Sequence, residues 1–238
     1  MKSWKRMPFL RHPRGEDLAS GHLSFRPMER LFEKLVDRFM IPFFSAADLG
    51  CGPGLFARYL SRRWRVPVFA LDPSRAMLRL ARRNCSGENV RLFRLDLRAM
   101  KFPSPVDLVT AHCGRIHHLV HPLDLGIALE RIAANLRPGG HFLFDFRTQC
   151  RPFPAHRFCS HAREVAPCAR WGPGQSTRPL LSIESPFLLS GGGFTLEDMG
   201  KALGRARLAV RELLDPSTLR PATACTPRLL VVATRARE

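Results

Sequence analysis

The stretch that decides the fold runs from Ala46 to Gly54 and reads AADLGCGPG. A short apolar run ends in Asp48, and the chain then alternates glycine with other residues at Gly50, Gly52 and Gly54. Apolar residues behind the glycines recur at spacings of three and four, which indicates an amphipathic helix. Glycine suits a loop that turns tightly or touches a ligand, because it has no Cβ and accepts positive φ. The order strand, glycine loop, helix therefore predicts a nucleotide site at the carboxyl end of a first strand.

Two nucleotide-binding patterns compete for this loop. The dinucleotide pattern G-x-G-x-x-G fits Gly50 and Gly52, but Leu55 occupies its third glycine position. The pattern D-x-G-x-G-x-G fits completely, from Asp48 to Gly54. This second pattern resembles the first motif of class I S-adenosylmethionine-dependent methyltransferases. A tight turn without any ligand remains as the third alternative.

The resemblance implies roles for the residues of the loop. It implies that Gly50, Cys51, Gly52 and Gly54 pack against the methionine and ribose portions of S-adenosyl-L-methionine. It also implies that Asp48 lies near the cationic methionine end of this cofactor, through hydrogen bonds or water.

Two further acidic residues follow apolar runs at the expected places. Asp72 stands 22 residues beyond Gly50, and a carboxylate there can accept hydrogen bonds from both ribose hydroxyls. The resemblance implies that Asp72 binds the ribose, with Pro73 beside it. It implies likewise that Asp96 binds the adenine amino group, with Leu97 beside it.

Histidines gather in the loop after the fourth expected strand, which should face the transferred methyl group. His112 lies at the end of the strand, and His117 and His118 follow in the same loop. Histidine commonly takes a proton near neutral pH, so His112 is the first candidate for a general base and also a candidate cofactor contact, and His117 is the second. The alternative is that these histidines only pack. The loop has no N/D-P-P-Y/F motif, and Cys113 lacks the context of a cytosine-5 nucleophile, which lowers the expectation of a nucleic-acid substrate.

The expected fold class is α/β. The resemblance implies a three-layer sandwich around a seven-stranded, mostly parallel, doubly wound sheet with strand order 3-2-1-4-5-7-6 and strand seven antiparallel. In this interpretation Asp124 caps a helix that includes Leu136 and that residues 137–140 of the LRPGG segment end. The expected helices and strands, in chain order, are a helix at 28–39, strands at 46–48, 66–72, 90–97, 105–112 and 141–146, helices after each glycine or cap signal, a helix at 194–205, and strands at 208–214 and 228–234.

We expect one methyltransferase domain over residues 1–238. Residues 1–45 would form an N-terminal segment with a helix that covers the cofactor. Residues 149–193, with one strand at 180–189, would form a substrate-recognition insertion or a surface loop, because plain connections are far shorter.

Composition bears on partners and compartment. The net charge is +18, and 33 of the 38 basic residues are arginines, which reflects either an anionic partner such as nucleic acid or the coding bias of the genome. No apolar run reaches the length of a membrane helix, and no signal peptide is evident, so we expect a cytoplasmic protein without a membrane partner. Seven cysteines without paired spacing suit a reducing compartment. A spread cluster of cysteine and histidine between 150 and 168 is a weak zinc pattern, so no metal site is expected.

Three hypotheses for function follow. The first is a methyltransferase for a small-molecule acceptor, and the second is a methyltransferase for RNA or protein, suggested by the charge. The third is a cofactor-binding protein without catalysis that acts through partners. No residue pattern identifies the acceptor, the need for a base or the oligomeric state.

Overall fold

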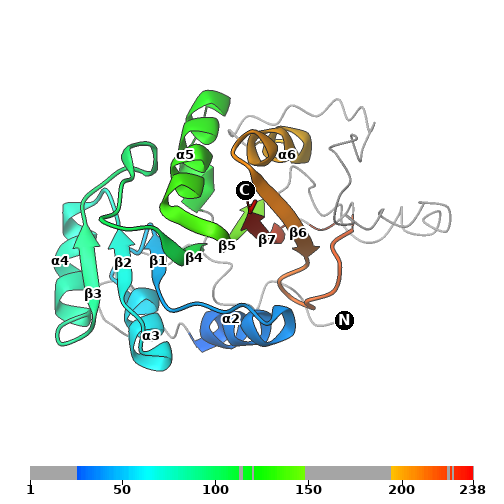
Figure 1. Cartoon of the computed structure of the whole chain (residues 1–238). Coiled ribbons are helices and arrows are strands. Elements are labelled where there is room, and N and C mark those ends of the chain that lie inside the picture. The colour runs from blue at the N-terminus through cyan, green and yellow to red at the C-terminus, as the bar shows by residue number, and fades with distance from the viewer. Residues whose placement is uncertain are drawn as a thin grey trace, which may run out of the picture.

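A twisted sheet with helices on both faces organises the chain (Figure 1). The structure is a computed structural model, and it describes residues 26–112, 115–119, 121–147, 194–223, 226 and 228–237. Its elements are α2 (Arg26–Phe39), β1 (Ala46–Leu49), α3 (Leu55–Trp64), β2 (Val68–Leu71), α4 (Arg75–Asn84), β3 (Val90–Phe93), the 3-10 turn η3 (Leu97–Ala99), β4 (Val106–Ala111), the 3-10 turn η4 (Arg115–His118), α5 (Pro122–Asn135), β5 (Leu136–Arg147), α6 (Leu196–Arg205), β6 (Leu208–Leu214) and β7 (Arg228–Arg235).

The strand order confirms the expected topology. Within the described residues the sheet has seven strands in the order β3-β2-β1-β4-β5-β7-β6. The first five strands of this order are parallel, and β7 runs antiparallel to both β5 and β6. The carboxyl ends of the parallel strands therefore meet at one edge, where open sheets of this kind bind ligands.

Each face of the sheet buries its own apolar core. In β1, Ala47 and Leu49 join the core under α5 and α6, whereas Ala46 joins the core under α2, α3 and α4. Figure 1 shows α5 and α6 on one side of the sheet and α2 and α3 on the other. A strand covered on both faces has apolar residues on both sides, which explains why Ala46, Ala47 and Leu49 of β1 show no alternation with exposed polar residues.

The start of α5 differs from the expectation. Asp124 was the expected cap, but the helix begins at Pro122 and the Nδ1 atom of His121 accepts a hydrogen bond from the Leu123 amide at 3.2 Å. Proline suits a first helical position because its fixed φ is helical and its missing N–H would have no partner there. Asp124 instead lies in the first turn, where its charge favours the helix dipole.

The third strand is shorter than expected. It was predicted to run through Leu97, but β3 ends at Phe93 and Leu97 opens η3. The reason is the length of the one strand that pairs with β3 among the described residues: β2 pairs with it from Val68 to Leu71, and Leu71 lies opposite Phe93. Beyond that point a strand would have no neighbour for its amides.

The LRPGG segment also behaves differently. It was expected to end the helix and reverse the chain, but α5 ends at Asn135 and the segment forms the start of β5. Leu136 pairs with Val106 and His141 with Leu108, so residues 137–140 form a bulge in the strand. Gly139 has φ 78, a conformation that glycine adopts without strain.

Several expectations fall on residues outside those described. These are the N-terminal part of the segment at 1–45, the insertion at 149–193 with its strand at 180–189, and the cysteine and histidine cluster between 150 and 168. None of the helices in the described ranges combines the length and apolar character of a membrane-crossing helix.

Candidate active site

Three glycines shape the loop between β1 and α3. Gly50, Gly52 and Gly54 have φ of 66, 54 and 78, so a side chain at any of them would strain the backbone. A Cβ at Gly54 would lie 2.8 Å from the Sγ of Cys85 and 3.0 Å from the Cβ of Ala81, both near the end of α4. Gly54 therefore lets two helices pack closely, whereas its role toward a cofactor stays a prediction.

Asp48, the last residue but one of β1, is a buried carboxyl with spare bonding capacity. It is 4% exposed, and its Oδ1 accepts a hydrogen bond from the Thr110 hydroxyl at 3.3 Å. Its Oδ2 is buried and makes no hydrogen bond of good geometry with a described residue, although the Ala57 amide lies near enough to lower the pKa slightly. Burial raises the pKa of Asp48 to about 7, against a smaller opposing effect of the Arg115 charge. A buried acceptor without a partner at a strand end is the kind of group that a ligand donor satisfies.

Arg115, which the sequence analysis did not single out, covers the glycine loop. A Cβ built on Gly50 would lie 2.6 Å from Cδ and 3.0 Å from Nε of Arg115, and one on Gly52 would lie 3.3 Å from Nη2. No hydrogen bond or ion pair joins the Arg115 guanidinium to a described residue. The two glycines thus make room for a cationic side chain beside the buried carboxyl of Asp48.

Asp72 lies buried behind the same loop. Its Oδ2 accepts a hydrogen bond from the Gly52 amide at 3.0 Å, and its Oδ1 accepts one from the Ser74 amide at 2.8 Å. At 4% exposure Asp72 is buried, although it follows the end of β2. Each carboxylate oxygen still has a second lone pair, so Asp72 can hold the loop and accept a further donor. Pro73 follows it as an exposed residue.

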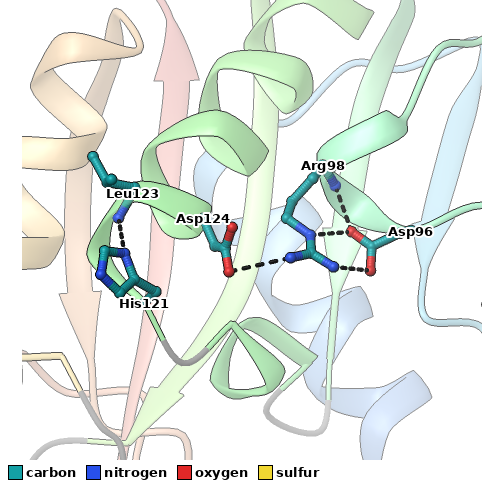
Figure 2. A network of polar contacts seen from close by, with 5 residues as sticks. All are labelled: Asp96, Arg98, His121, Leu123 and Asp124. Atoms are coloured by element: carbon teal, nitrogen blue, oxygen red, sulfur yellow. Dashed lines mark hydrogen bonds and ion pairs between the residues drawn. The ribbon is translucent and has the colours of Figure 1, made fainter.

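Asp96 is bound to a neighbouring arginine (Figure 2). Arg98 donates from Nε to Oδ1 of Asp96 at 2.8 Å and from Nη2 to Oδ2 at 3.1 Å, and its Nη1 reaches Asp124 at 3.2 Å. The hydrogen bonds from Arg98 lower the pKa of Asp96. Arg98 thereby ties η3 to the first turn of α5, while Leu97 packs against the core beneath. An adenine amino group would have to share Asp96 with this guanidinium.

His112 is a buried, neutral imidazole at the end of β4. It is 8% exposed, its ring meets the Phe56 ring edge-on at 4.8 Å between centroids, and its Nε2 has no partner among the described residues. Burial lowers the pKa of His112 to about 4. His112 is therefore free to accept a hydrogen bond at neutral pH, but it is a weak base. His117 lies in η4, and the structure does not describe its side chain.

A buried ion pair near His112 also escaped the sequence analysis. Arg228 on β7 donates from Nε to Oδ2 of Asp145 on β5 at 2.8 Å, and both side chains are about nine-tenths buried, at 10% and 8% exposure. The charges of Asp145 and Arg228 act on His112 in opposite directions. The two residues are 83 positions apart, so no local spacing could have revealed them.

The remaining thiols and possible ligands show no metal chemistry in the described part of the chain. Cys51 is buried in the glycine loop, and burial raises the pKa of its thiol. No group of three or more histidine, cysteine or acidic side chains in the described ranges is arranged to hold a metal ion.

Sequence comparisons match the part of the chain that runs from β1 to the start of β5. Residues 46–140 match the model of a family described as a methyltransferase domain. A trans-aconitate 2-methyltransferase of Azoarcus sp. (strain BH72) is 37% identical over 97 residues, which are 40% of this chain and 36% of that protein. A dTDP-3-amino-3,6-dideoxy-alpha-D-glucopyranose N,N-dimethyltransferase of Streptomyces fradiae is 33% identical over 96 residues, again 40% of this chain and 36% of that protein. The matched stretch thus spans about a third of the length of these relatives.

Solved structures agree over nearly the whole chain. An S-adenosylmethionine-dependent methyltransferase of Clostridium acetobutylicum superposes with a TM-score of 0.67 at 16% identity, covering 93% of this chain and 96% of that one. An amino pentose methyltransferase of Micromonospora echinaspora, solved with S-adenosylmethionine bound, gives 0.62 at 19% identity, covering 95% and 98%. At such identities the likeness shows the fold. Residues 46–140 thus match a methyltransferase domain, and the chain has the fold of the S-adenosylmethionine-dependent methyltransferases on which it superposes.

Proposed function

We propose that the protein transfers a methyl group from S-adenosyl-L-methionine to a small-molecule acceptor. The observation that carries this proposal is the loop between β1 and α3, where Asp48 keeps a buried oxygen without a partner and Arg115 covers Gly50 and Gly52. Two relatives are named for methyl transfer to trans-aconitate and to an amino sugar. These names support a small-molecule acceptor.

The charges at this loop fit an amino acid in its zwitterionic form. Asp48 offers an acceptor to an ammonium group, and Arg115 offers a guanidinium fork to a carboxylate. The methionine portion of the cofactor carries both of these groups, whereas NAD has no such pair. The long stem of Arg115 is flexible enough to move aside while its guanidinium stays near the loop.

The acids of the neighbouring strands complete the cofactor side. Asp72, already bound to the amides of Gly52 and Ser74, is proposed to accept the ribose hydroxyls with its remaining lone pairs. Asp96 is proposed to reach the adenine amino group, in competition with Arg98.

The chemistry needs positioning more than proton transfer. The bound cofactor supplies a methyl group already activated for in-line displacement, so the protein has to align the acceptor and exclude water, which is worth about 7–11 kcal/mol in favourable cases. His112 remains the first candidate base by its place, but its lowered pKa makes it a poor one. We therefore favour an acceptor that attacks without losing a proton first, such as a carboxylate or a neutral amine, with His117 as the alternative base.

We also place the protein in the cytoplasm. Cys51 and Cys85 are free, buried thiols, as is usual in a reducing compartment.

Calorimetry with S-adenosylhomocysteine tests the cofactor assignment. Wild-type protein should bind this product, and Arg115→Gln should weaken its binding about 10- to 100-fold, the usual worth of a hydrogen bond to a charged group. The same variant should bind the decarboxylated analogue, or 5′-methylthioadenosine, as wild type does. Arg131→Gln, an exposed arginine on α5, is the matched control and should leave all affinities unchanged.

Two outcomes would contradict the proposal. Binding of NAD without either sulfur compound would mean a different cofactor. Equal losses for the product and its decarboxylated analogue would mean that Arg115 does not meet the carboxylate. Incubation with labelled cofactor and a panel of organic acids and amino sugars then identifies the acceptor class, and binding without turnover on any panel would favour a non-catalytic role.

A further inference from the structure

Arginines from two elements line one groove on the outer side of the sheet. The groove has a volume of about 370 Å³ and is lined by Arg75, Leu78, Arg79 and Arg82 of α4 and by Arg94, which follows β3. The fold gathers these four arginines at the edge of the sheet beyond β2.

The charge of this groove is uncompensated. Between residues 73 and 95 the chain has six arginines and one acidic residue, Glu88. Glu88 forms an ion pair with Arg62 at 2.6 Å, so its charge compensates Arg62 and not the arginines of the groove. No ion pair joins the three groove arginines of α4 to a described residue, and Arg94 donates only to the Pro73 carbonyl, at 3.3 Å. Like charges at these helical spacings repel one another, so α4 tolerates a cost that a bound anion would relieve.

Protection of the sheet edge does not account for the groove. Charged residues on an edge strand prevent unwanted strand pairing, and this explains Arg91 on β3. The guanidinium of Arg91 also lies 5.3 Å from the centre of the Phe93 ring. The arginines of α4 lie on a helix, where no strand edge needs protection.

The composition of the groove favours phosphate over an acidic protein. Protein interfaces centre on apolar anchors, but Leu78 is the one apolar side chain that lines the groove. The exposed large apolar residues of the described chain are Met40, Phe44, Leu123 and Ile127, and none of them lies on α4 or β3. Guanidinium forks match phosphate oxygens in pairs, and this match needs no apolar partner.

The spacing of the arginines suits a chain of phosphates. Arg75 and Arg82 are separated by about 10 Å along the helix at 1.5 Å per residue. Three nucleotides rise by about the same distance at 3.4 Å each. We propose that the groove of α4 and β3 binds the backbone phosphates of a nucleic-acid strand. This inference is independent of the proposed methyl acceptor, because it uses only the charge and the shape of this surface.

The groove begins beside the residues proposed for the cofactor. Arg75 stands three positions after Asp72, and Arg94 stands two positions before Asp96. A strand bound in the groove would therefore run past the carboxyl edge of the sheet, next to the active site.

Fluorescence anisotropy with a labelled 12-nucleotide single-stranded RNA tests the proposal on the full chain. The test variant removes three charges from the groove: Arg75→Gln, Arg79→Gln and Arg82→Gln. The control variant removes three charges from exposed arginines elsewhere: Arg131→Gln, Arg205→Gln and Arg220→Gln. Each phosphate contact with a single strand contributes a slope of about 0.7 in log affinity against log salt. We therefore expect the groove variant to bind about 100-fold more weakly at 0.1 M salt, with a slope shallower by about 2, and the control variant to bind nearly as wild type.

Other outcomes would overturn the proposal. Equal losses in both variants would show that net charge alone attracts the strand. Wild-type binding to vesicles with anionic lipids, without binding to RNA or to the same sequence of DNA, would make the groove a membrane-facing surface. Photo-crosslinking of wild-type protein to the RNA gives a second measurement that needs no variant. Crosslinks within residues 75–94 support the groove, and crosslinks confined to other segments contradict it.

Discussion

The buried carboxyl of Asp48 links ionisation to folding. Its pKa is raised to about 7, and its ordinary value is 3.8. Between these two values the folded protein keeps a proton that the unfolded chain has lost, so stability falls as the pH rises through this window. A difference of one pH unit between the folded and unfolded pKa corresponds to about 1.4 kcal/mol, so the ionised carboxyl at pH 8 costs about 4 kcal/mol.

Asp48→Asn should therefore stabilise the protein in a pH-dependent way. At pH 8 the amide replaces a buried charge, and we expect a gain of about 2–4 kcal/mol in the free energy of unfolding. At pH 5 the wild-type carboxyl is already protonated, and we expect little change. Urea unfolding at the two pH values measures the difference, and the same variant should bind S-adenosylhomocysteine more weakly.

A matched acid on the neighbouring strand is the control. Asp107 accepts hydrogen bonds from the Phe44 amide, the Ser45 hydroxyl and Arg137, at 2.9, 2.8 and 2.9 Å. Asp107→Asn should therefore lose stability at pH 8. If Asp48→Asn lost stability as well, Asp48 would have partners in place of a spare oxygen.

The lowered pKa of His112 changes the stability of the protein with pH in the opposite direction to Asp48, over nearly the same pH range. The pKa of His112 is lowered to about 4 from 6.5, so the unfolded chain holds the extra proton and stability rises with pH through this window. In the wild-type protein these two effects on the free energy of unfolding oppose each other. In Asp48→Asn only the effect of His112 remains, and the free energy of unfolding should increase from pH 4 to pH 6.5.

At the level of single residues, spacing predicts where some residues lie in the fold and hides where others lie. The place of the glycine loop after β1 was predictable because its pattern is local, and that of Asp72 because it directly follows β2, whereas their roles toward a cofactor stay predictions. The place of Arg115 was not predictable, because a single arginine in a loop carries no pattern until β4 is placed beside β1. The burial of Asp72 was missed for a similar reason, since one of its two amide partners, Gly52, comes from a different loop.

At the level of elements, a buried ion pair joins β5 and β7. Asp145 lies opposite Leu230 in the antiparallel register, and Arg228 reaches it from two positions away. A buried ion pair is tolerated in a sheet only while both charges are present. Either charge alone would be buried without a partner, which is strongly destabilising.

Removing one partner should cost more than removing both. Arg228→Met leaves Asp145 unpaired, and we expect a loss of about 3–5 kcal/mol in the free energy of unfolding. Asp145→Leu combined with Arg228→Met should recover most of that loss, since apolar side chains of similar size then fill the space. Urea unfolding of the three proteins measures this. If the double variant were no more stable than the single one, packing and not charge would explain the loss.

The order of the strands was predictable from the resemblance, whereas the ends of several elements were not. A strand ends where its partner ends, as β3 does opposite Leu71. The bulge at the start of β5 depends likewise on pairing with β4, which the glycines of LRPGG do not encode. The early start of α5 was readable in principle, because Pro122 is a favoured first helical residue.

At the level of the whole molecule, a net charge of +18 on 238 residues opposes compaction. Surface charges of one sign repel each other over the Debye length, which is about 30 Å at 0.01 M salt and 10 Å at 0.1 M. The six salt bridges of the described residues that lie at the surface relieve little of this, because exposed pairs are each worth about 0–1 kcal/mol. Salt should therefore stabilise this protein, whereas it weakens proteins held by surface ion pairs.

Thermal unfolding at different sodium chloride concentrations tests whether repulsion between the surface charges destabilises the protein. From 0.01 to 0.3 M we expect Tm to rise by about 2–6 °C, which corresponds to about 1–2 kcal/mol for a chain of this size. The two triple variants, in the groove and elsewhere, separate a general effect from a local one. If repulsion acts over the whole surface, both variants should start from a higher Tm at low salt and gain less from added salt, by similar amounts. A larger change in the groove variant would place the repulsion in α4 and β3, and a fall in wild-type Tm with salt would contradict repulsion as the main electrostatic effect.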